Sequence, residues 1–186
     1  MEGNISMILV INICKEKLHY LEFVKPIEDT IKKTGIKFNT KHYISINSKD
    51  LKNADKIIIC GTSLKDNCFI EDIKRFEWIR NYDKPVLGIC GGMQIIGSVF
   101  LAKIGKKTEI GLFKEKFIGD FLGINAGSEE EVYHLHNFFI ELPKGFLKLT
   151  DSKIPQAIKH KEKLIYGTLF HPEVRQKKII EEFLKI

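Results

Sequence analysis

The chain has 186 residues, of which 44% are hydrophobic and 29% are charged, so its size and apolar content suit one folded core. Its formal net charge is +6, but the excess is almost wholly lysine, and no glycine-rich basic segment with interleaved aromatic residues occurs. A solvated lysine surface is therefore favoured over a nucleic-acid partner. No apolar run approaches the about 18 residues that a membrane-spanning helix needs, so we expect no membrane partner.

Four cysteines, Cys14, Cys60, Cys68 and Cys90, lack the Cys-x-x-Cys spacing of metal and redox motifs. Two of them end apolar runs, as buried thiols often do. The early apolar stretch at residues 7–13 follows an acidic residue rather than a basic segment, so it predicts a first strand and not a signal peptide. Together these features favour a reducing, cytoplasmic location.

Strands and helices alternate in the first half of the chain. After the apolar run at residues 7–13, apolar side chains recur at helical spacing until Gly35. The pattern then predicts an extended segment over residues 38–46, a short polar helix over 48–53, a strand over 56–60, a helix over 69–81 and a fully apolar strand over 86–89. This alternation predicts parallel β-α-β units, with the last of these strands near the centre of the sheet.

Short extended pieces separated by Gly, Pro and Asp turns follow from Thr108 to Phe170, and they predict antiparallel strands. The pieces are residues 109–117, 131–135, 138–142, 156–159 and 164–170. An amphipathic helix over 174–184 ends the chain. The fold class predicted is a three-layer α/β fold, with a mostly parallel central sheet flanked by helices and a small antiparallel β addition in the C-terminal half.

A glycine-rich turn surrounds Cys90, between the strand at 86–89 and an apolar helix. Gly88-x-Cys90-x-Gly92 is the cysteine version of a nucleophile elbow. A nucleophile on a sharp turn needs neighbours without side chains, because the backbone is strained and the substrate must come close. The positive end of the following helix favours a thiolate and can hold an oxyanion. The alternative is that Cys90 is a small buried residue in a common type of strand-to-helix turn.

A candidate base for this nucleophile is His171, which follows an apolar strand. Glu173, two residues on and held by the rigid Pro172, can accept a proton from one imidazole nitrogen, so that the other nitrogen faces the thiol. Cysteine, histidine and glutamate would then form a triad. The alternative is that Pro172 and Glu173 merely begin the last helix, where proline and an acidic residue are ordinary first-turn residues.

Together, the segments from Gly88 to Gln94 and from Phe170 to Glu173 resemble the signature of class I glutamine amidotransferases, a Gly-Ile-Cys-x-Gly-x-Gln elbow and a Phe-His-Pro-Glu tail. The resemblance covers nearly the whole chain and implies a flavodoxin-like fold and a single glutamine amidotransferase type 1 domain over residues 1–186. Residues 142–146, 157–161 and 165–167 look most like the glutaminase of GMP synthase, especially the separate-subunit archaeal kind. The Cys-Gly-Gly elbow also resembles the cobyric-acid-synthase type.

The resemblance implies a glutaminase that releases ammonia from glutamine. It assigns catalysis to Cys90 as nucleophile, His171 as general base and acid, and Glu173 as the orienting carboxylate. The residues that it assigns to binding glutamine and its oxyanion are Gly61, Gly91 and Gln94. It implies no cofactor, and it implies that ammonia passes to a synthetase subunit on a separate chain, of the GMP synthase ATP-pyrophosphatase type.

Two segments depart from the family pattern. The family has a Ser-Gly-Gly-Pro turn where this chain has Cys60-Gly61-Thr62-Ser63, and only Gly61 matches. The family's Ser-His-Gly-Asp-Glu-Val stretch corresponds to residues 134–140, which lack its acidic pair. These departures keep two other hypotheses open: a stand-alone cysteine hydrolase of γ-glutamyl or related amides, and a catalytically weak regulatory or binding homologue.

His134 and His136 would point to the same side of a strand, as two metal ligands can. A third plausible ligand is not found nearby in the sequence, and we therefore expect no metal site.

Overall fold

The computed structural model describes residues 7–186 and contains a seven-stranded sheet. The strands, in their order across the sheet, are β2 (Lys37–His42), β1 (Met7–Asn12), β3 (Lys56–Ile59), β4 (Val86–Ile89), β9 (Ile165–Thr168), β8 (Ala157–His160) and β7 (Phe146–Lys148). Neighbours from β2 to β9 run parallel, whereas β8 and β7 are antiparallel to their neighbours. The predicted mostly parallel sheet is confirmed, and the carboxyl ends of β3, β4 and β9 meet at one edge.

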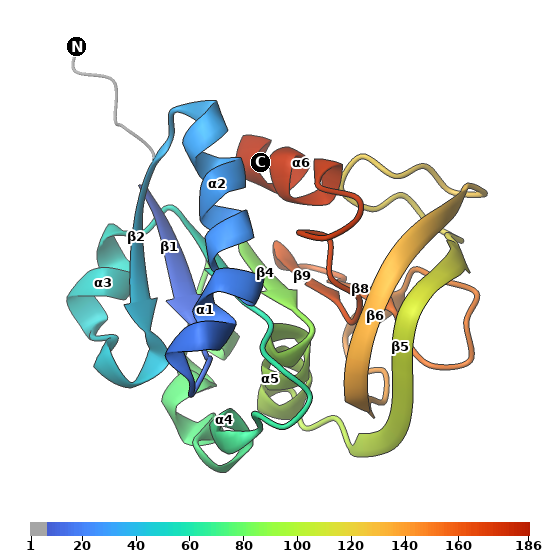
Figure 1. The fold of residues 1–186 in the computed structure, drawn as a ribbon, viewed down its shortest axis with the longest axis horizontal. Helices are drawn as coiled ribbons and strands as arrows, with labels where there is room; N and C mark the ends of the chain where they lie inside the picture. The colour runs from blue at the N-terminus through green and yellow to red at the C-terminus, as the bar shows by residue number, and fades with distance from the viewer. Residues whose placement is uncertain (1–6) are drawn as a thin grey trace.

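Helices cover both faces of this sheet and make three layers (Figure 1). One face is covered by α1 (Lys17–Phe23), α2 (Lys25–Thr34) and α6 (Lys178–Lys185), and the other by α3 (Ser48–Asn53), α4 (Cys68–Glu71), the 3₁₀ helix η2 (Ile73–Asn81) and α5 (Gly91–Val99). Alternate residues of β1 pack in the two cores, Ile8 in the first and Leu9 in the second. A continuous apolar strand fills both cores because successive side chains point to opposite faces.

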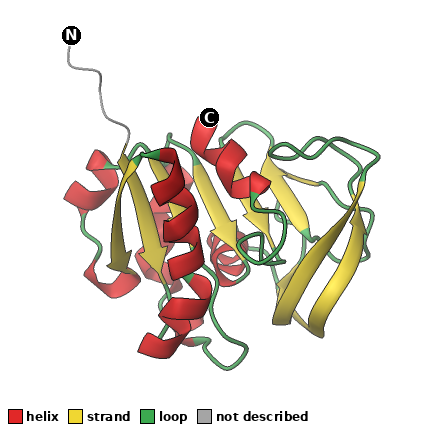
Figure 2. Cartoon of the chain, turned by 45° about the horizontal axis from the view of Figure 1, so that its top comes forward, coloured by secondary structure: helices red, strands yellow, loops and turns green. Residues whose placement is uncertain are grey.

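A two-stranded antiparallel ribbon, β5 (Ile104–Lys116) and β6 (Glu129–Ile140), stands beside the sheet (Figure 1 and Figure 2). It confirms the predicted antiparallel addition. The separation of residues 131–135 from 138–142 is wrong, because β6 continues without a break from the first piece into the second and ends at Ile140. The polar His136 does not end the strand, since it lies opposite Glu109 in the register of the ribbon.

The helical pattern before Gly35 forms two helices, α1 and α2, that meet at Val24. Pro26 lies in the first turn of α2, where the N–H that proline lacks would have no partner in any case. Gly35 ends α2 with a φ of 74°, a left-handed conformation that glycine adopts without strain. The predicted stop at this glycine is confirmed.

Two other predicted elements have different limits. The extended segment predicted over 38–46 ends earlier, in the 3₁₀ turn η1 (Tyr43–Ser45). The helix predicted over 69–81 is the short α4 followed by η2, so most of it winds as a 3₁₀ helix. The short strand β7 falls outside the predicted pieces.

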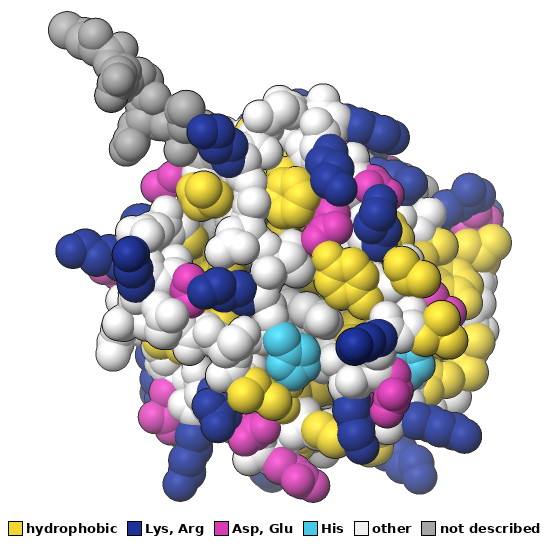
Figure 3. All heavy atoms as spheres, turned by 60° about the vertical axis from the view of Figure 1, so that its left-hand side comes forward, with side chains coloured by type: hydrophobic (Ala, Val, Ile, Leu, Met, Phe, Trp, Pro, Cys, Tyr) yellow, Lys and Arg dark blue, Asp and Glu magenta, His cyan; other side chains and the backbone are white. Residues whose placement is uncertain are grey.

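Lysine and arginine side chains stand out over the face drawn in Figure 3 and are interspersed with acidic ones. This distribution agrees with the solvated lysine surface expected from the sequence. None of the helices formed by residues 7–186 combines the length and the apolar character needed to span a bilayer.

Candidate active site

Cys90 lies at the junction of β4 and α5, with a φ of 49° and a ψ of −102°. Positive φ values are unfavourable for residues with a Cβ and cost about 1–3 kcal/mol. Two hydrogen bonds hold the strained residue: its N–H donates to the Thr168 carbonyl at 2.7 Å, and its own carbonyl accepts from the N–H of Gln94 at 3.0 Å. The predicted strand-turn-helix elbow is therefore present, fixed by β9 on one side and α5 on the other.

Two glycines allow α5 to approach the sheet this closely. A Cβ atom at Gly88 would lie 2.5 Å from the carbonyl oxygen of Gly92, and one at Gly92 would lie 2.3 Å from the carbonyl oxygen of Ile59. Both are backbone contacts, which cannot be relieved by turning a side chain. The glycines of the motif are thus required by the packing of the elbow itself.

The thiol of Cys90 differs from two other buried thiols of the chain. Burial raises the pKa of Cys14 to about 11 and raises that of Cys60 well above its usual value, so both stay protonated at neutral pH. Cys90 instead immediately precedes the N-terminus of α5. Its Sγ lies 3.5 Å from the carbonyl oxygen of Leu135, on β6.

His171 and Glu173 form a buried pair beyond the end of β9. The His171 Nδ1 lies 2.7 Å from the Glu173 Oε1, and both side chains are fully buried. Burial alone would lower the pKa of His171, but the charges of Glu173 and then Cys90 outweigh it and hold this pKa well above its usual value. The other ring nitrogen, Nε2, is buried without a hydrogen-bond partner among the described residues.

Glu173 is not part of the last helix, because α6 begins only at Lys178. The helix predicted over 174–184 is therefore shorter. Gln176 has a φ of 70°, which is not a helical conformation, and it lies just before α6. The alternative in which Pro172 and Glu173 merely begin that helix is wrong.

Gly61, at the end of β3, lies between the imidazole and the elbow. A Cβ atom there would be 2.7 Å from the His171 Cε1 and 3.4 Å from the Cys90 Cβ. The carboxyl ends of β3, β4 and β9 thus bring Gly61, Cys90 and His171 together, as expected for chemistry at this edge of a parallel sheet.

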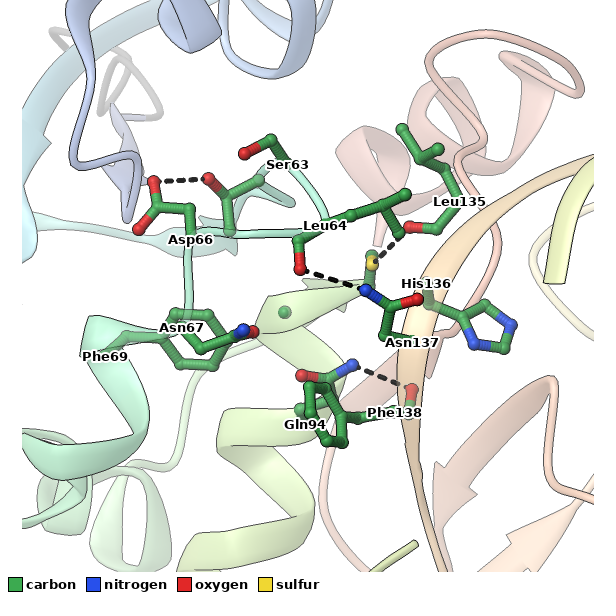
Figure 4. Close-up of a pocket in the computed structure, with 13 residues that line it drawn as sticks. Ser63, Leu64, Asp66, Asn67, Phe69, Gln94, Leu135, His136, Asn137 and Phe138 are labelled. Atoms are coloured by element: carbon green, nitrogen blue, oxygen red, sulfur yellow. Dashed lines mark hydrogen bonds between the residues drawn. The ribbon is translucent and has the colours of Figure 1, made fainter. Parts of the chain in front are cut away.

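A small pocket opens in front of Cys90 (Figure 4), and Gly91 and Gln94 also line it. The other predicted residues, Gly61, His171 and Glu173, are not among the residues that line it. Its free volume is about 10 Å³, which is about the space of one water molecule. In this conformation the pocket is too small for an amino-acid side chain.

The strand β6 closes this pocket through hydrogen bonds to both of its walls (Figure 4). The side-chain amide of Gln94 donates to the Phe138 carbonyl at 3.0 Å, and the amide of Asn137 donates to the Leu64 carbonyl at 3.2 Å. Neither Leu135 nor Asn137 belongs to a sequence motif that predicts a site residue. Leu135 faces the thiol through its backbone carbonyl, which no side-chain pattern reveals, whereas the amide of Asn137 next to a family binding segment was a usable signal.

The sequence predicts no metal site because no third ligand lies near His134 and His136 in the chain, but the structure places one beside them. Glu109 of β5 lies beside His134 and His136 of β6, and one ligand-type atom from each falls within 4.8 Å of the others. The sequence missed Glu109 because it lies 25 residues before His134, and only the register of the ribbon brings the two together.

The model of the family Glutamine amidotransferase class-I matches residues 19–185 of the chain. The chain belongs to the class I glutamine amidotransferase family. The family membership suggested by the elbow at Cys90 and the tail at His171 is confirmed.

Similar proteins include separate subunits of GMP synthase. The one from Methanosphaera stadtmanae, a subunit of glutamine-hydrolyzing GMP synthase, is 40% identical over 127 residues, which are 59% of this chain and 64% of that protein. The corresponding subunit from Archaeoglobus fulgidus is 32% identical over 137 residues, or 68% of this chain and 70% of that one. A GMP synthase of Spiroplasma kunkelii is 36% identical, but the match spans only 24% of its length. The matched region thus spans less than two thirds of the length of the relatives from Methanosphaera stadtmanae and Spiroplasma kunkelii.

Solved structures share the fold. A crystal structure described as that of a candidate GMP synthase subunit from Thermoplasma acidophilum has a TM-score of 0.85 with 24% identity, covering 97% of this chain and 93% of that one. A glutamine amidotransferase from Thermotoga maritima has a TM-score of 0.73 with 19% identity, covering 97% and 83%. The predicted class I amidotransferase fold is confirmed.

Proposed function

We propose that this protein hydrolyses glutamine to glutamate and ammonia with Cys90 as nucleophile, His171 as general base and acid, and Glu173 as the carboxylate that orients His171. One observation carries the proposal. In a class I glutamine amidotransferase chain, the strained Cys90 elbow lies beside a fully buried His171–Glu173 pair, with Gly61 between the imidazole and the elbow.

Activation of the thiol uses the two nitrogens of His171 differently. Glu173 accepts a hydrogen bond from Nδ1–H, so Nε2 is free to take the proton of the Cys90 thiol. The resulting thiolate lies at the N-terminus of α5, and the imidazolium is stabilised by the buried carboxylate. The raised pKa of His171 supports this ion pair, since it favours the protonated ring.

The thiolate attacks the side-chain carboxamide carbon of glutamine and forms a tetrahedral oxyanion. The Gly91 N–H in the first turn of α5 and the backbone of the Gly61 turn are the groups assigned to stabilise it. The C–N bond then breaks, and the nitrogen leaves as ammonia with a proton from His171. Water next attacks the glutamyl thioester and gives a proton to His171, and the C–S bond breaks to release glutamate and the Cys90 thiolate.

Glutamine must first displace β6. The Leu135 carbonyl faces the sulfur and Gln94 is occupied by the Phe138 carbonyl, so neither the nucleophile nor the binding amide is free in the closed pocket. We expect the Gln94 amide to exchange Phe138 for the bound glutamine. The chain alone is therefore expected to turn over slowly.

We further propose that the ammonia acceptor is a synthetase subunit on a separate chain, of the GMP synthase ATP-pyrophosphatase type, in the cytoplasm. The relatives from Methanosphaera stadtmanae and Archaeoglobus fulgidus are each named as one subunit of a GMP synthase, which supports this partner. Passing ammonia directly between subunits protects it from protonation in bulk solvent.

The deciding assay measures ammonia release from glutamine by the purified chain with and without a GMP synthetase subunit, ATP and xanthosine monophosphate. We expect ammonia release that rises with the partner and disappears in Cys90→Ala, whereas Cys68→Ala, which alters an exposed thiol, keeps full activity. Unchanged turnover in Cys90→Ala would exclude the proposed nucleophile, and turnover without any effect of the partner would exclude the proposed acceptor.

A second candidate function is a stand-alone hydrolase of γ-glutamyl amides. It is favoured by Thr62, which is buried and stands where the family has glycine. The Thr62 hydroxyl donates to Asp66 at 2.8 Å, and both residues line the pocket. Screening γ-glutamyl conjugates without a partner distinguishes the two functions. Turnover of a conjugate well above that of glutamine would favour the hydrolase, and no turnover of any conjugate would dismiss it.

A further inference from the structure

A cluster of ligand-type side chains lies in the ribbon, separate from the proposed triad. Glu109 comes from β5, and His134 and His136 come from β6, where strand alternation turns both rings to the same side. His136 also lines the pocket in front of the nucleophile, and in Figure 4 its ring points away from Asn137 and Gln94. Both histidines are buried. The mechanism proposed above uses none of the three.

The spacing of the three ligand-type atoms suits one small cation. The Glu109 Oε2 lies 3.2 Å from the His134 Nδ1 and 3.1 Å from the His136 Nε2. A tetrahedral ion with bonds of about 2.0–2.2 Å separates its ligands by roughly 3.3–3.5 Å. The two observed separations are close to this value, so small shifts would complete the geometry.

The orientation of His136 favours a metal site over a simple hydrogen-bond network. Its Nε2 is 3.1 Å from the Glu109 carboxylate, yet neither ring nitrogen has a hydrogen-bond partner among the described residues. Buried polar nitrogens without a partner are costly and uncommon. A metal ion bound between the His136 Nε2 and the Glu109 Oε2 would give this ring nitrogen the partner that it lacks.

The surroundings supply the outer contacts that metal-binding residues usually have. The Glu115 Oε1 lies 3.4 Å from the His134 Nε2, the ring nitrogen that faces away from Glu109. The two atoms form no hydrogen bond in this conformation, but a small shift would let the ring donate to the carboxylate, a contact that orients histidine ligands of metal ions. The Lys107 Nζ lies 2.5 Å from the Glu109 Oε1, so it leaves Oε2 turned toward the imidazoles, and the Gln156 amide donates to Oε2 at 2.8 Å.

We propose that Glu109, His134 and His136 bind a divalent transition-metal ion of the Zn²⁺ type, with a water or the Gln156 side-chain oxygen as the fourth ligand. Two imidazoles and a carboxylate are ligands that Zn²⁺ accepts and that Mg²⁺, which prefers oxygen, does not. The ion would cross-link β5 and β6 next to Leu135, whose carbonyl covers the Cys90 thiol. It would act as a structural clamp on the strand that closes the pocket.

The test uses the full chain with Cys90→Ser, so that a thiolate cannot bind the metal instead. Metal-stripped protein is titrated with Zn²⁺ against a chromophoric chelator, with Co²⁺ by visible absorption, and with Mg²⁺. We expect one equivalent of Zn²⁺, a tetrahedral Co²⁺ spectrum and no Mg²⁺ binding. Glu109→Gln, His134→Asn and His136→Asn should each weaken Zn²⁺ binding more than about 100-fold, because even outer partners of a site are worth about 10- to 100-fold.

Two matched controls are His160→Asn, on β8, and Glu129→Gln, at the far end of the ribbon, and both should bind Zn²⁺ normally. Zinc X-ray absorption of the Cys90→Ser protein, which depends on none of the ribbon variants, should show nitrogen and oxygen ligands without sulfur. No saturable Zn²⁺ binding, sulfur ligation, or equal binding in the three ribbon variants would overturn the proposal. Since glutamine turnover is not measured, these outcomes leave the proposed glutaminase function to its own test.

Discussion

The parallel sheet and the β5–β6 ribbon contribute to the candidate site in different ways. The sheet holds the proposed catalytic residues: Cys90 lies between β4 and α5, and the backbone of Gly61 lies against the His171 ring. The ribbon adds the Leu135 carbonyl over the sulfur and two side-chain hydrogen bonds that close the pocket. The sheet therefore fixes the geometry of the proposed catalytic residues, whereas the ribbon covers the pocket in front of Cys90.

The largest effect is expected for Glu173→Gln in the sheet half of the site. The amide keeps the shape of the side chain but removes the charge that orients and stabilises the protonated His171. We expect kcat for glutamine to fall by about 10³- to 10⁴-fold, measured in the presence of the synthetase subunit. Glu181→Gln, an exposed acid of α6, is the control, and an equally small change in both variants would contradict the triad.

The elbow can be broken without touching a reactive group. Gly92→Ala places a Cβ atom 2.3 Å from the Ile59 carbonyl oxygen, and we expect it to lower the free energy of unfolding by about 3 kcal/mol or more. Gly127→Ala is the matched control, because its φ of 86° is strained for alanine but its surroundings are open, so about 1–2 kcal/mol is expected. Urea unfolding measures both. Equal losses would show that the close packing of the elbow does not matter.

The pH dependence of turnover reports on the ion pair of the sheet half. The raised pKa of His171 means that the imidazolium persists at a pH where an ordinary histidine, with a pKa of about 6.5, has lost its proton. The active thiolate–imidazolium form is lost as the pH rises through this raised pKa, so the basic limb of kcat/KM should lie well above pH 6.5. Glu173→Gln should move that limb to lower pH. A basic limb at or below pH 6.5 in the unmodified protein would contradict the assignment.

The smallest effect is expected for Asn137→Ala in the ribbon. It removes one hydrogen bond that keeps β6 against the pocket loop, worth about 0.5–1.5 kcal/mol. The open state should gain population, and partner-free glutamine turnover should rise by about 2- to 10-fold. The exposed Asn53→Ala should have no effect. A fall in partner-free turnover in Asn137→Ala would argue against closure by the ribbon.

The same two regions differ in how well the sequence predicts them. The strand, turn and helix around Cys90 depend on a local apolar run and on nearby glycines, so about ten consecutive residues are enough to predict them. The ribbon depends on register: Glu109 meets His136 only through pairing across a long hairpin, and β6 was therefore divided in two. The late start of α6 follows from the backbone of Gln176, which no side-chain pattern signals.

The candidate site divides in the same way. The residues proposed to act through their side chains, Cys90, His171 and Glu173, are predicted from motif and spacing, and the structure brings them to one end of the sheet. The closure by Leu135 was not found because a backbone carbonyl makes the contact. Sequence patterns therefore identified the proposed chemistry better than the access to it.

The most direct test of the central claim is covalent labelling with a chloroketone analogue of glutamine in the presence of the synthetase subunit, followed by peptide mass mapping and an activity assay. We predict one adduct, on Cys90, with loss of glutaminase activity in proportion to labelling and protection by glutamine. Labelling confined to another cysteine, or full activity in protein labelled at Cys90, would contradict the assignment of Cys90 as the nucleophile that attacks glutamine.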